Sequence, residues 1–127
     1  MLLKHDSPFY PVENDRVLFT TGRVLAFYDR YPVSKGHTLV IPLQIVKSIF
    51  ELDDNTLAEL WKVVARVRAQ LAAEYHPDAF NIGINDGVAA GQTVSHSHIH
   101  IIPRYNGDVM DPRGGIRNVI PLKARYW

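Results

Sequence analysis

The hydrophobic pattern of the chain divides it into short, strand-like segments separated by one long helical segment. Short stretches rich in β-branched and aromatic residues are typical of strands. They occur at residues 16–20, 24–28, 37–41, 80–85 and 96–103. Thr21-Gly22 between the first two stretches predicts a hairpin, and Pro42 is expected to stop the third strand.

The long helical segment lies between the third and fourth predicted strands. From Leu57 to Tyr75, apolar residues recur at the spacing of a helix face. Asp53 and the three residues after it are N-cap candidates, and Thr56-x-x-Glu59 has the pattern of a capping box. Pro77 is expected to end this helix, and residues 45–50 are expected to form a short helical turn.

The length of 127 residues indicates one domain over residues 1–127. Residues 1–14 contain two prolines and no hydrophobic period, so they predict an irregular N-terminal arm. Residues 105–127 contain several Gly and Pro residues and predict an irregular tail. Hairpins combined with one long helix indicate an α+β fold.

Composition narrows the possible functions. The apolar fraction of 46% and charged fraction of 21% are ordinary for a globular protein, and a net charge of +1 gives no general case for nucleic-acid or membrane binding. No apolar run approaches the roughly 20 residues of a membrane span, and no signal-peptide pattern opens the sequence, so we expect a cytoplasmic protein. The absence of cysteine excludes disulfides, thiolate catalysis and a cysteine zinc site.

The stretch from Gly91 to Arg104 contains the candidate chemistry. His96, His98 and His100 stand at alternate positions, so in a strand they share one face along roughly 13 Å. Imidazoles titrate near neutral pH, and such a row could combine a nucleophile, an acid and an anion binder. The glycine-containing loop before it could offer backbone N–H groups to phosphate.

The segment His96-Ser97-His98-Ile99-His100-Ile101-Ile102 resembles the signature of the histidine-triad nucleotide hydrolases and transferases. Its flanks, Gly91-Gln92-Thr93-Val94 and Pro103-Arg104, resemble the branch with fragile-histidine-triad and bacterial dinucleoside-polyphosphate hydrolases. Ser97 departs from the pattern, which usually has an apolar residue there. The resemblance implies a five-stranded antiparallel sheet with one long and one short helix, paired as a homodimer. Ser7-Pro8-Phe9-Tyr10 stands where many bacterial members have Cys-x-x-Cys, so we expect no structural zinc of that type.

The resemblance also implies a role for individual residues. His98 would attack the α-phosphate, His100 would contact phosphate oxygens, and His96 and His37 would support the nucleophile. The implied substrate contacts are Asp29 at the ribose, Asn85 on the phosphate side, and Gly91, Gln92 and Thr93 near the phosphates and leaving group. Leu18, Phe19 and Phe27 are candidates for an apolar base pocket and equally for the core.

The reaction implied is cleavage of dinucleoside polyphosphates, such as diadenosine tetraphosphate, through a nucleotidyl-histidine intermediate. Phosphoramidate hydrolysis and nucleotidyl transfer or phosphorolysis are alternatives within the same family. A histidine-ligated metal enzyme and a non-catalytic nucleotide-binding protein are alternatives from other classes. No glutamate follows Glu74, and the first acid after the three histidines is Asp108, which weighs against a metal centre. We expect no tightly bound cofactor, although a divalent cation can enter with the polyphosphate. The expected partners are a nucleotide and a second copy of the chain, with no nucleic acid or membrane.

Overall fold

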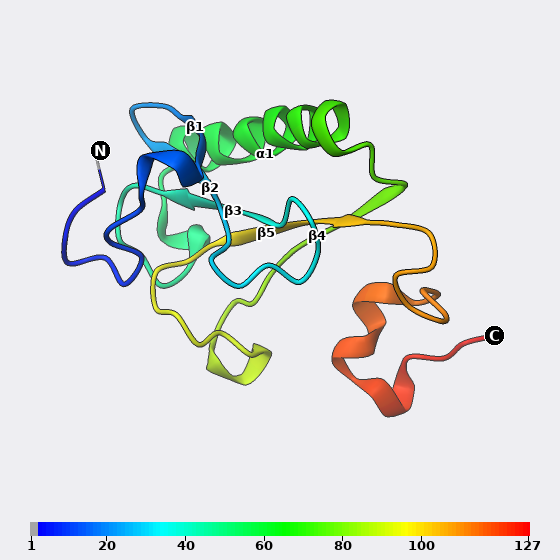
Figure 1. The fold of residues 1–127 in the computed structure, drawn as a ribbon. Helices are drawn as coiled ribbons and strands as arrows, with labels where there is room; N and C mark the ends of the chain where they lie inside the picture. Colours follow the sequence, from blue (N-terminus) through cyan, green and yellow to red (C-terminus); the bar gives the residue numbers. More distant parts are fainter. Residues whose placement is uncertain (1–2) are drawn as a thin grey trace.

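The structure, a computed structural model, describes residues 3–127 and contains a five-stranded antiparallel sheet with one long helix across one face (Figure 1). This confirms the predicted α+β architecture. The strand order is β1-β2-β3-β5-β4. The strands are β1 Val17–Thr20, β2 Val24–Tyr28, β3 Thr38–Pro42, β4 Ala79–Ile84 and β5 Ile99–Arg104. The short helices are 3₁₀ turns: η1 Asn14–Arg16, η2 Ile49–Glu51, η3 Val88–Ala90, η4 Gly115–Val119 and η5 Pro121–Lys123.

The long helix α1 spans Asp54–Tyr75 and is capped at both ends. The Asp53 carboxylate accepts the N–H of Thr56 at 2.7 Å, so Asp53 is the N-cap and Thr56 lies inside the first turn. The capping box predicted at Thr56 is therefore wrong; a capping box is present at η2, between Ser48 and Glu51. His76 ends the helix in the left-handed conformation, directly before Pro77.

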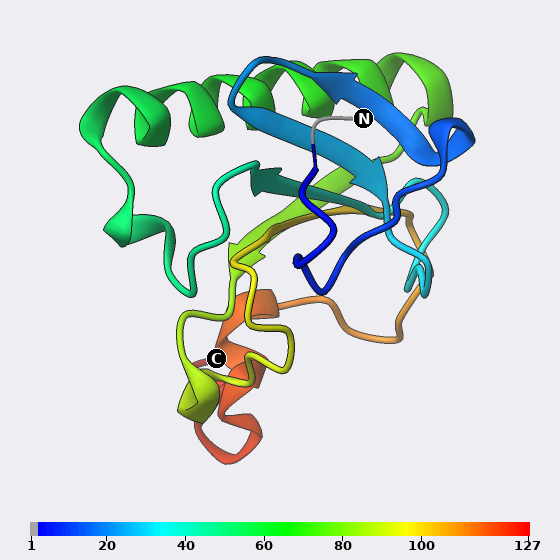
Figure 2. The ribbon, with the colours of Figure 1, turned by 90° about the vertical axis from the view of Figure 1, so that its left-hand side faces the viewer.

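The two faces of the sheet are covered by different parts of the chain. Alternate strand residues point to opposite faces, so Ala26 and Ile99 pack under α1 while Leu25 and Phe27 pack on the other side. The second face is covered by the N-terminal arm, which buries Leu3 and further residues against it. Figure 2 shows this arm and the loop after β4 on the side of the sheet away from α1. The arm is therefore packed, and this face provides the site.

The strand that follows the loop begins later than the sequence indicated. Pairing between β3 and β5 starts at Val40 and Ile99, so His96 and His98 precede the strand and His100 alone of the three lies in it. The reason is a competing partner: the N–H of Ser97 donates to the carbonyl of Val46, outside the sheet, at 2.8 Å. Pro42 does not stop β3 before its position but is its last residue, and it pairs with Val24 of β2.

The C-terminal tail folds into η4 and η5 instead of being irregular throughout, and it lies below β4 in Figure 1. In the described residues, none of the helices has the combined length and apolar character needed to cross a bilayer.

Candidate active site

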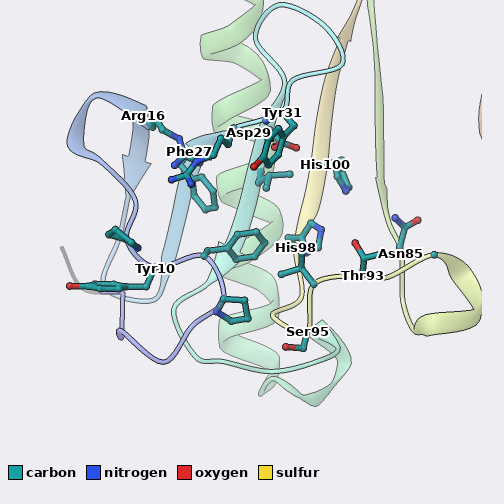
Figure 3. Close-up of a pocket in the computed structure, with 17 residues that line it drawn as sticks. Tyr10, Arg16, Phe27, Asp29, Tyr31, Asn85, Thr93, Ser95, His98 and His100 are labelled. Carbon is teal, nitrogen blue, oxygen red and sulfur yellow. Dashed lines mark hydrogen bonds between the residues drawn. The ribbon is translucent and has the colours of Figure 1, made fainter.

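A cavity of about 620 Å³ opens on the sheet face opposite α1. Its walls come from the N-terminal arm, β2, β3, the loop after β4 and the start of β5. Figure 3 shows Arg16, Phe27 and Asp29 on one side, Asn85 and Thr93 on the other, and His98 between them. The cavity thus has an apolar and charged side, a polar side, and an imidazole at the centre.

The ring of His98 is oriented by its own backbone. Its Nδ1–H donates to the carbonyl oxygen of His96 at 2.9 Å, and because a carbonyl can only accept, the proton of the neutral ring must be on Nδ1. The lone pair is then on Nε2. No hydrogen bond within residues 3–127 uses this nitrogen, and His98 lines the cavity. His98 therefore presents an unprotonated nitrogen to whatever occupies the cavity.

His96 is fully buried and does not line the cavity. Its Nε2–H donates to the carbonyl of Pro42 at 2.7 Å, so its Nδ1 accepts the hydroxyl proton of Ser7 at 2.6 Å. The three histidines consequently do not form one row on one face. His96 lies beneath the cavity, and the supporting role that the resemblance implies for it stays a prediction.

His37 and His100 form a second bonded pair, and their tautomers follow from their partners. The N–H of Val33 donates to Nδ1 of His37 at 3.1 Å, so the neutral His37 ring carries its proton on Nε2. That Nε2–H donates to Nδ1 of His100 at 2.9 Å. The neutral His100 ring then carries its proton on Nε2, beside His98, whose ring centroid is 5.0 Å away. The Nε2–H donor of His100 and the Nε2 lone pair of His98 thus belong to neighbouring rings in the cavity.

Burial keeps these supporting rings neutral at physiological pH. It lowers the pKa of His100 from 6.5 to about 4, with the nearby His98 and His37 as smaller causes. Burial also lowers the pKa of His37, although the Asp29 carboxylate acts in the opposite direction. The pKa of His96 is lowered by burial as well, against the opposing effect of the Pro42 carbonyl. His100 therefore acts as a neutral donor at pH 7.

Asp29 lines the cavity and also has two partners in the protein. One carboxylate oxygen accepts the N–H of Tyr31 at 2.9 Å, and the other lies 3.5 Å from Nε2 of His37. The second oxygen remains available to a ligand. Asp29, His37 and His100 each offer an atom to a possible metal ion, with all three atoms within 4.8 Å of one another. Asp29 is distant from the histidine motif in sequence, but it directly follows β2, and the fold brings it to His37 and His100.

The loop after β4 differs in detail from its predicted role. Most of its N–H groups close the loop on itself, and Gln92 braces it by accepting from Gly87 and donating to the carbonyls of Lys47 and Val94. Gln92 thus does not line the cavity, whereas Gly91, Thr93 and Asn85 do. Gly91 has φ +100°, which glycine adopts without strain.

Residues 93–95, just after the loop, provide the free donors. In the described part of the chain, no hydrogen bond uses the main-chain N–H of Thr93, Val94 or Ser95, and all three residues line the cavity. Three unpaired N–H groups beside an imidazole donor favour an anionic ligand such as phosphate.

Of the three residues predicted for the base pocket, one lines the cavity. Phe27 lines the cavity, but Leu18 and Phe19 do not; both pack toward the core under α1. A register shift between Val17 and Phe19 in β1 places them there, and Phe19 is covered by the guanidinium of Arg66 at 4.5 Å.

Several cavity residues were not predicted, some because the N-terminal arm has no hydrophobic period and the others because neither the period nor the resemblance marks their side chains. The missed lining residues include Pro8, Phe9, Tyr10, Pro11, Arg16, Arg30, Tyr31, Leu39, Val94 and Ser95. Arg16 is the clearest case. Its guanidinium lies over the Phe27 ring, 5.4 Å from the ring centre, and donates to the Tyr28 carbonyl and to Glu13, so these contacts hold it at the cavity wall.

The comparison with known families agrees with this geometry. The HIT domain matches residues 11–107, which include β1 to β5, His37 and the three histidines at 96, 98 and 100. The chain belongs to this family. The arm up to residue 10 and the tail after residue 107 lie outside the matched region.

Relatives of this HIT-domain protein include named hydrolases. It is 40% identical over 99 residues to the bis(5'-nucleosyl)-tetraphosphatase [asymmetrical] of Schizosaccharomyces pombe, covering 78% of this chain and 54% of that protein. It is 36% identical over 97 residues to the bis(5'-adenosyl)-triphosphatase of Dictyostelium discoideum, covering 76% of this chain and 65% of that protein. The chain thus spans about half to two thirds of the length of these two relatives.

Solved structures share the fold. A crystal structure of a HIT family protein from Bacillus anthracis matches with a TM-score of 0.69 and 41% identity, over 72% of this chain and 65% of that one. The NitFhit protein of Caenorhabditis elegans matches with a TM-score of 0.74 and 35% identity, over 85% of this chain and 26% of that one.

Proposed function

We propose that this HIT-domain protein hydrolyses dinucleoside polyphosphates, such as diadenosine tetraphosphate, through a nucleotidyl intermediate on His98. The observation that carries the proposal is the unprotonated Nε2 of His98 in the cavity, fixed by the bond from Nδ1–H to the His96 carbonyl. A neutral imidazole nitrogen is a competent nucleophile, and covalent catalysis divides one difficult displacement into two easier ones. Two relatives are named as hydrolases of the same substrate class, which supports the proposal.

The proposed reaction has two displacements at one phosphorus. In the first, Nε2 of His98 attacks the α-phosphorus, the N–P bond forms, and the P–O bond to the polyphosphate leaving group breaks. In the second, water attacks the same phosphorus, the N–P bond breaks, and the nucleoside monophosphate leaves while the water gives up a proton to solvent. The Nε2–H of His100 and the free N–H groups of residues 93–95 can hold the phosphate oxygens in both steps.

The nucleoside half of the substrate is proposed to bind on the side of Phe27. The free carboxylate oxygen of Asp29 can accept from the ribose hydroxyls, and the Arg16 guanidinium at the cavity wall can contact the base. A divalent cation would enter with the polyphosphate as part of the substrate, because polyphosphates carry such ions.

The decisive experiment compares wild type with His98→Ala, using diadenosine tetraphosphate labelled at the α-phosphate. We expect wild type to retain acid-labile, base-stable label after a quench, and His98→Ala to retain neither label nor turnover while still binding nucleotide. His76→Asn, at an exposed histidine in the left-handed conformation that Asn tolerates, is the matched control and should behave as wild type. Turnover by His98→Ala at near the wild-type rate would refute the mechanism.

The alternatives give different results with the same protein. Faster cleavage of adenosine phosphoramidates would identify a phosphoramidate hydrolase, and a nucleoside diphosphate product in phosphate buffer would identify a phosphorylase. The cluster of Asp29, His37 and His100 favours the metal enzyme as the alternative from another class. Stoichiometric metal in the purified protein, with turnover lost on chelation and retained in His98→Ala, would support that alternative.

A further inference from the structure

The N-terminal arm lies outside the region that matches the HIT domain, yet it is tied to the catalytic histidines. The match begins at residue 11. Before it, Phe9 packs against the ring of Phe27, with centroids 5.5 Å apart, and against the ring of His98, with centroids 5.2 Å apart. Ser7 is 4% exposed, and its hydroxyl points inward to His96. The arm therefore belongs to the site.

The Ser7 hydroxyl has one hydrogen-bond acceptor for its proton. Its oxygen accepts the N–H of Phe9 at 3.2 Å, and its proton goes to Nδ1 of His96 at 2.6 Å. The opposite side of that ring is fixed, because Nε2–H donates to the Pro42 carbonyl at 2.7 Å. The other neutral tautomer would set a nitrogen lone pair against the carbonyl oxygen. Ser7 and Pro42 thus hold the His96 ring in one tautomer and one orientation.

The same residue orients the nucleophile through its main chain. The carbonyl of His96 accepts Nδ1–H of His98 at 2.9 Å, and this bond leaves the lone pair on Nε2. A shift of residue 96 would move this acceptor and release the His98 ring. Because residues 96 and 98 lie before β5, no ladder bonds of the sheet hold this carbonyl; its peptide is held by the bond from the Ser97 N–H to the Val46 carbonyl and, through the His96 ring, by Ser7 and Pro42.

We propose that Ser7 is a positioning residue of the active site. Its hydroxyl holds His96, and the His96 carbonyl in turn holds the His98 lone pair toward the cavity. This role rests on the proposed nucleophilic function of His98. It predicts that removing the Ser7 hydroxyl slows the chemical step without weakening substrate binding, because no atom of Ser7 lines the cavity.

The chain supplies a matched control in Ser97. Both serines are buried, at 4% and 1% exposure, and both adjoin the histidines. The Ser97 hydroxyl, however, has no hydrogen-bond partner in the described residues. Ser97→Ala removes the same group as Ser7→Ala without removing a bond. Ser7→Thr keeps the hydroxyl and tests rescue.

The kinetic test measures kcat and KM with diadenosine tetraphosphate. We expect Ser7→Ala to lower kcat by about 10- to 100-fold with KM within about threefold, the range that orienting partners of catalytic groups give. Ser97→Ala should stay within about twofold of wild type, and Ser7→Thr should recover most of the loss. Equal kcat in Ser7→Ala and Ser97→Ala would overturn the proposal.

A second measurement separates this proposal from the proposed function. Nitrogen-15 NMR of the imidazole rings reports the tautomers without any substrate. Wild type should show an unprotonated Nδ1 in His96 and an unprotonated Nε2 in His98, and Ser7→Ala should show a mixture of tautomers or exchange broadening at His98. An unchanged His98 pattern in Ser7→Ala overturns the positioning role, even if the wild type cleaves no dinucleotide. If Ser7→Ala does not fold, a protonated Nε2 on His98 in wild type would overturn it equally.

Discussion

Acid should destabilise this protein through its buried histidines before its carboxylates titrate. Burial lowers the pKa of His100 to about 4 in the folded state, against 6.5 for an unperturbed histidine. Between these values the unfolded chain binds a proton that the folded protein does not, so the free energy of unfolding falls as the pH falls. The loss begins near pH 6.5 and is complete below about pH 4.

The size of the effect follows from the two pKa values. At about 1.4 kcal/mol per pH unit, the full loss is about 3 kcal/mol, and about 2 kcal/mol is already lost at pH 5. The lowered pKa values of His37 and His96 act in the same direction. Carboxylates remain mostly ionised in both states down to about pH 5, so the interval from pH 8 to pH 5 reports the histidines.

Urea unfolding at pH 8 and pH 5, followed by tryptophan fluorescence, measures this loss. For a protein of this size, about 2 kcal/mol moves the midpoint by roughly 1 M urea. His100→Asn should remove about 2 kcal/mol of the difference, because the Asn oxygen can still accept from Nε2–H of His37 but cannot titrate. His76→Asn is the exposed control and should keep the wild-type difference. The same pH difference in His100→Asn and wild type would refute the reasoning.

Two further predictions concern the substrate and the assembly. Asp29→Asn should raise KM severalfold with little change in kcat, because a ribose contact is remote from the bond that breaks; a fall in kcat alone would instead assign Asp29 to the adjacent His37. We also propose that the protein is a homodimer with contacts from α1, because Trp61 is 43% exposed on that helix and Phe50 just before it is 68% exposed. Sedimentation should show a dimer in wild type and a monomer in Trp61→Glu, and a monomeric wild type at micromolar concentration would exclude this assembly.

Residue types along the chain were sufficient to predict the strands, because β-branched and aromatic residues gather in buried strands, whereas the five-stranded antiparallel sheet was implied by the resemblance to the histidine-triad family. The predicted bounds of β2 are those observed, and β4 differs by one residue at each end. The helix was predicted from the spacing of its apolar residues, and Leu60, Val64 and Val67 on one face of this helix are indeed buried. Its N-cap was narrowed only to Asp53 and the three residues after it, because Asp, Asn and Thr are all acceptable cap residues and only the backbone geometry distinguishes them.

Contacts between distant segments could not be predicted in the same way. The arm has no period, because Leu3, Ser7 and Val12 are buried by the sheet they cover and not by their own secondary structure. Asp29 is close to His100 only because β2, β3 and β5 are neighbours in the sheet. Gln92 was misassigned because a position in a loop does not show whether a side chain points into a cavity or braces the loop.

The alternation of the three histidines suggested one shared face, and the late start of β5 explains why they instead have three different environments. In a continuous strand, all three rings would face one side and their carbonyls would bond to the neighbouring strand. Because the ladder begins at Ile99, the carbonyl of His96 is free to accept from His98, and the ring of His96 turns inward to Ser7. His100 lies within the ladder, and its ring bonds to His37, which directly precedes the neighbouring strand β3. The same break in the strand therefore separates a buried ring, a ring with a free lone pair and a ring with a free donor, and the proposed nucleotidyl transfer would use all three.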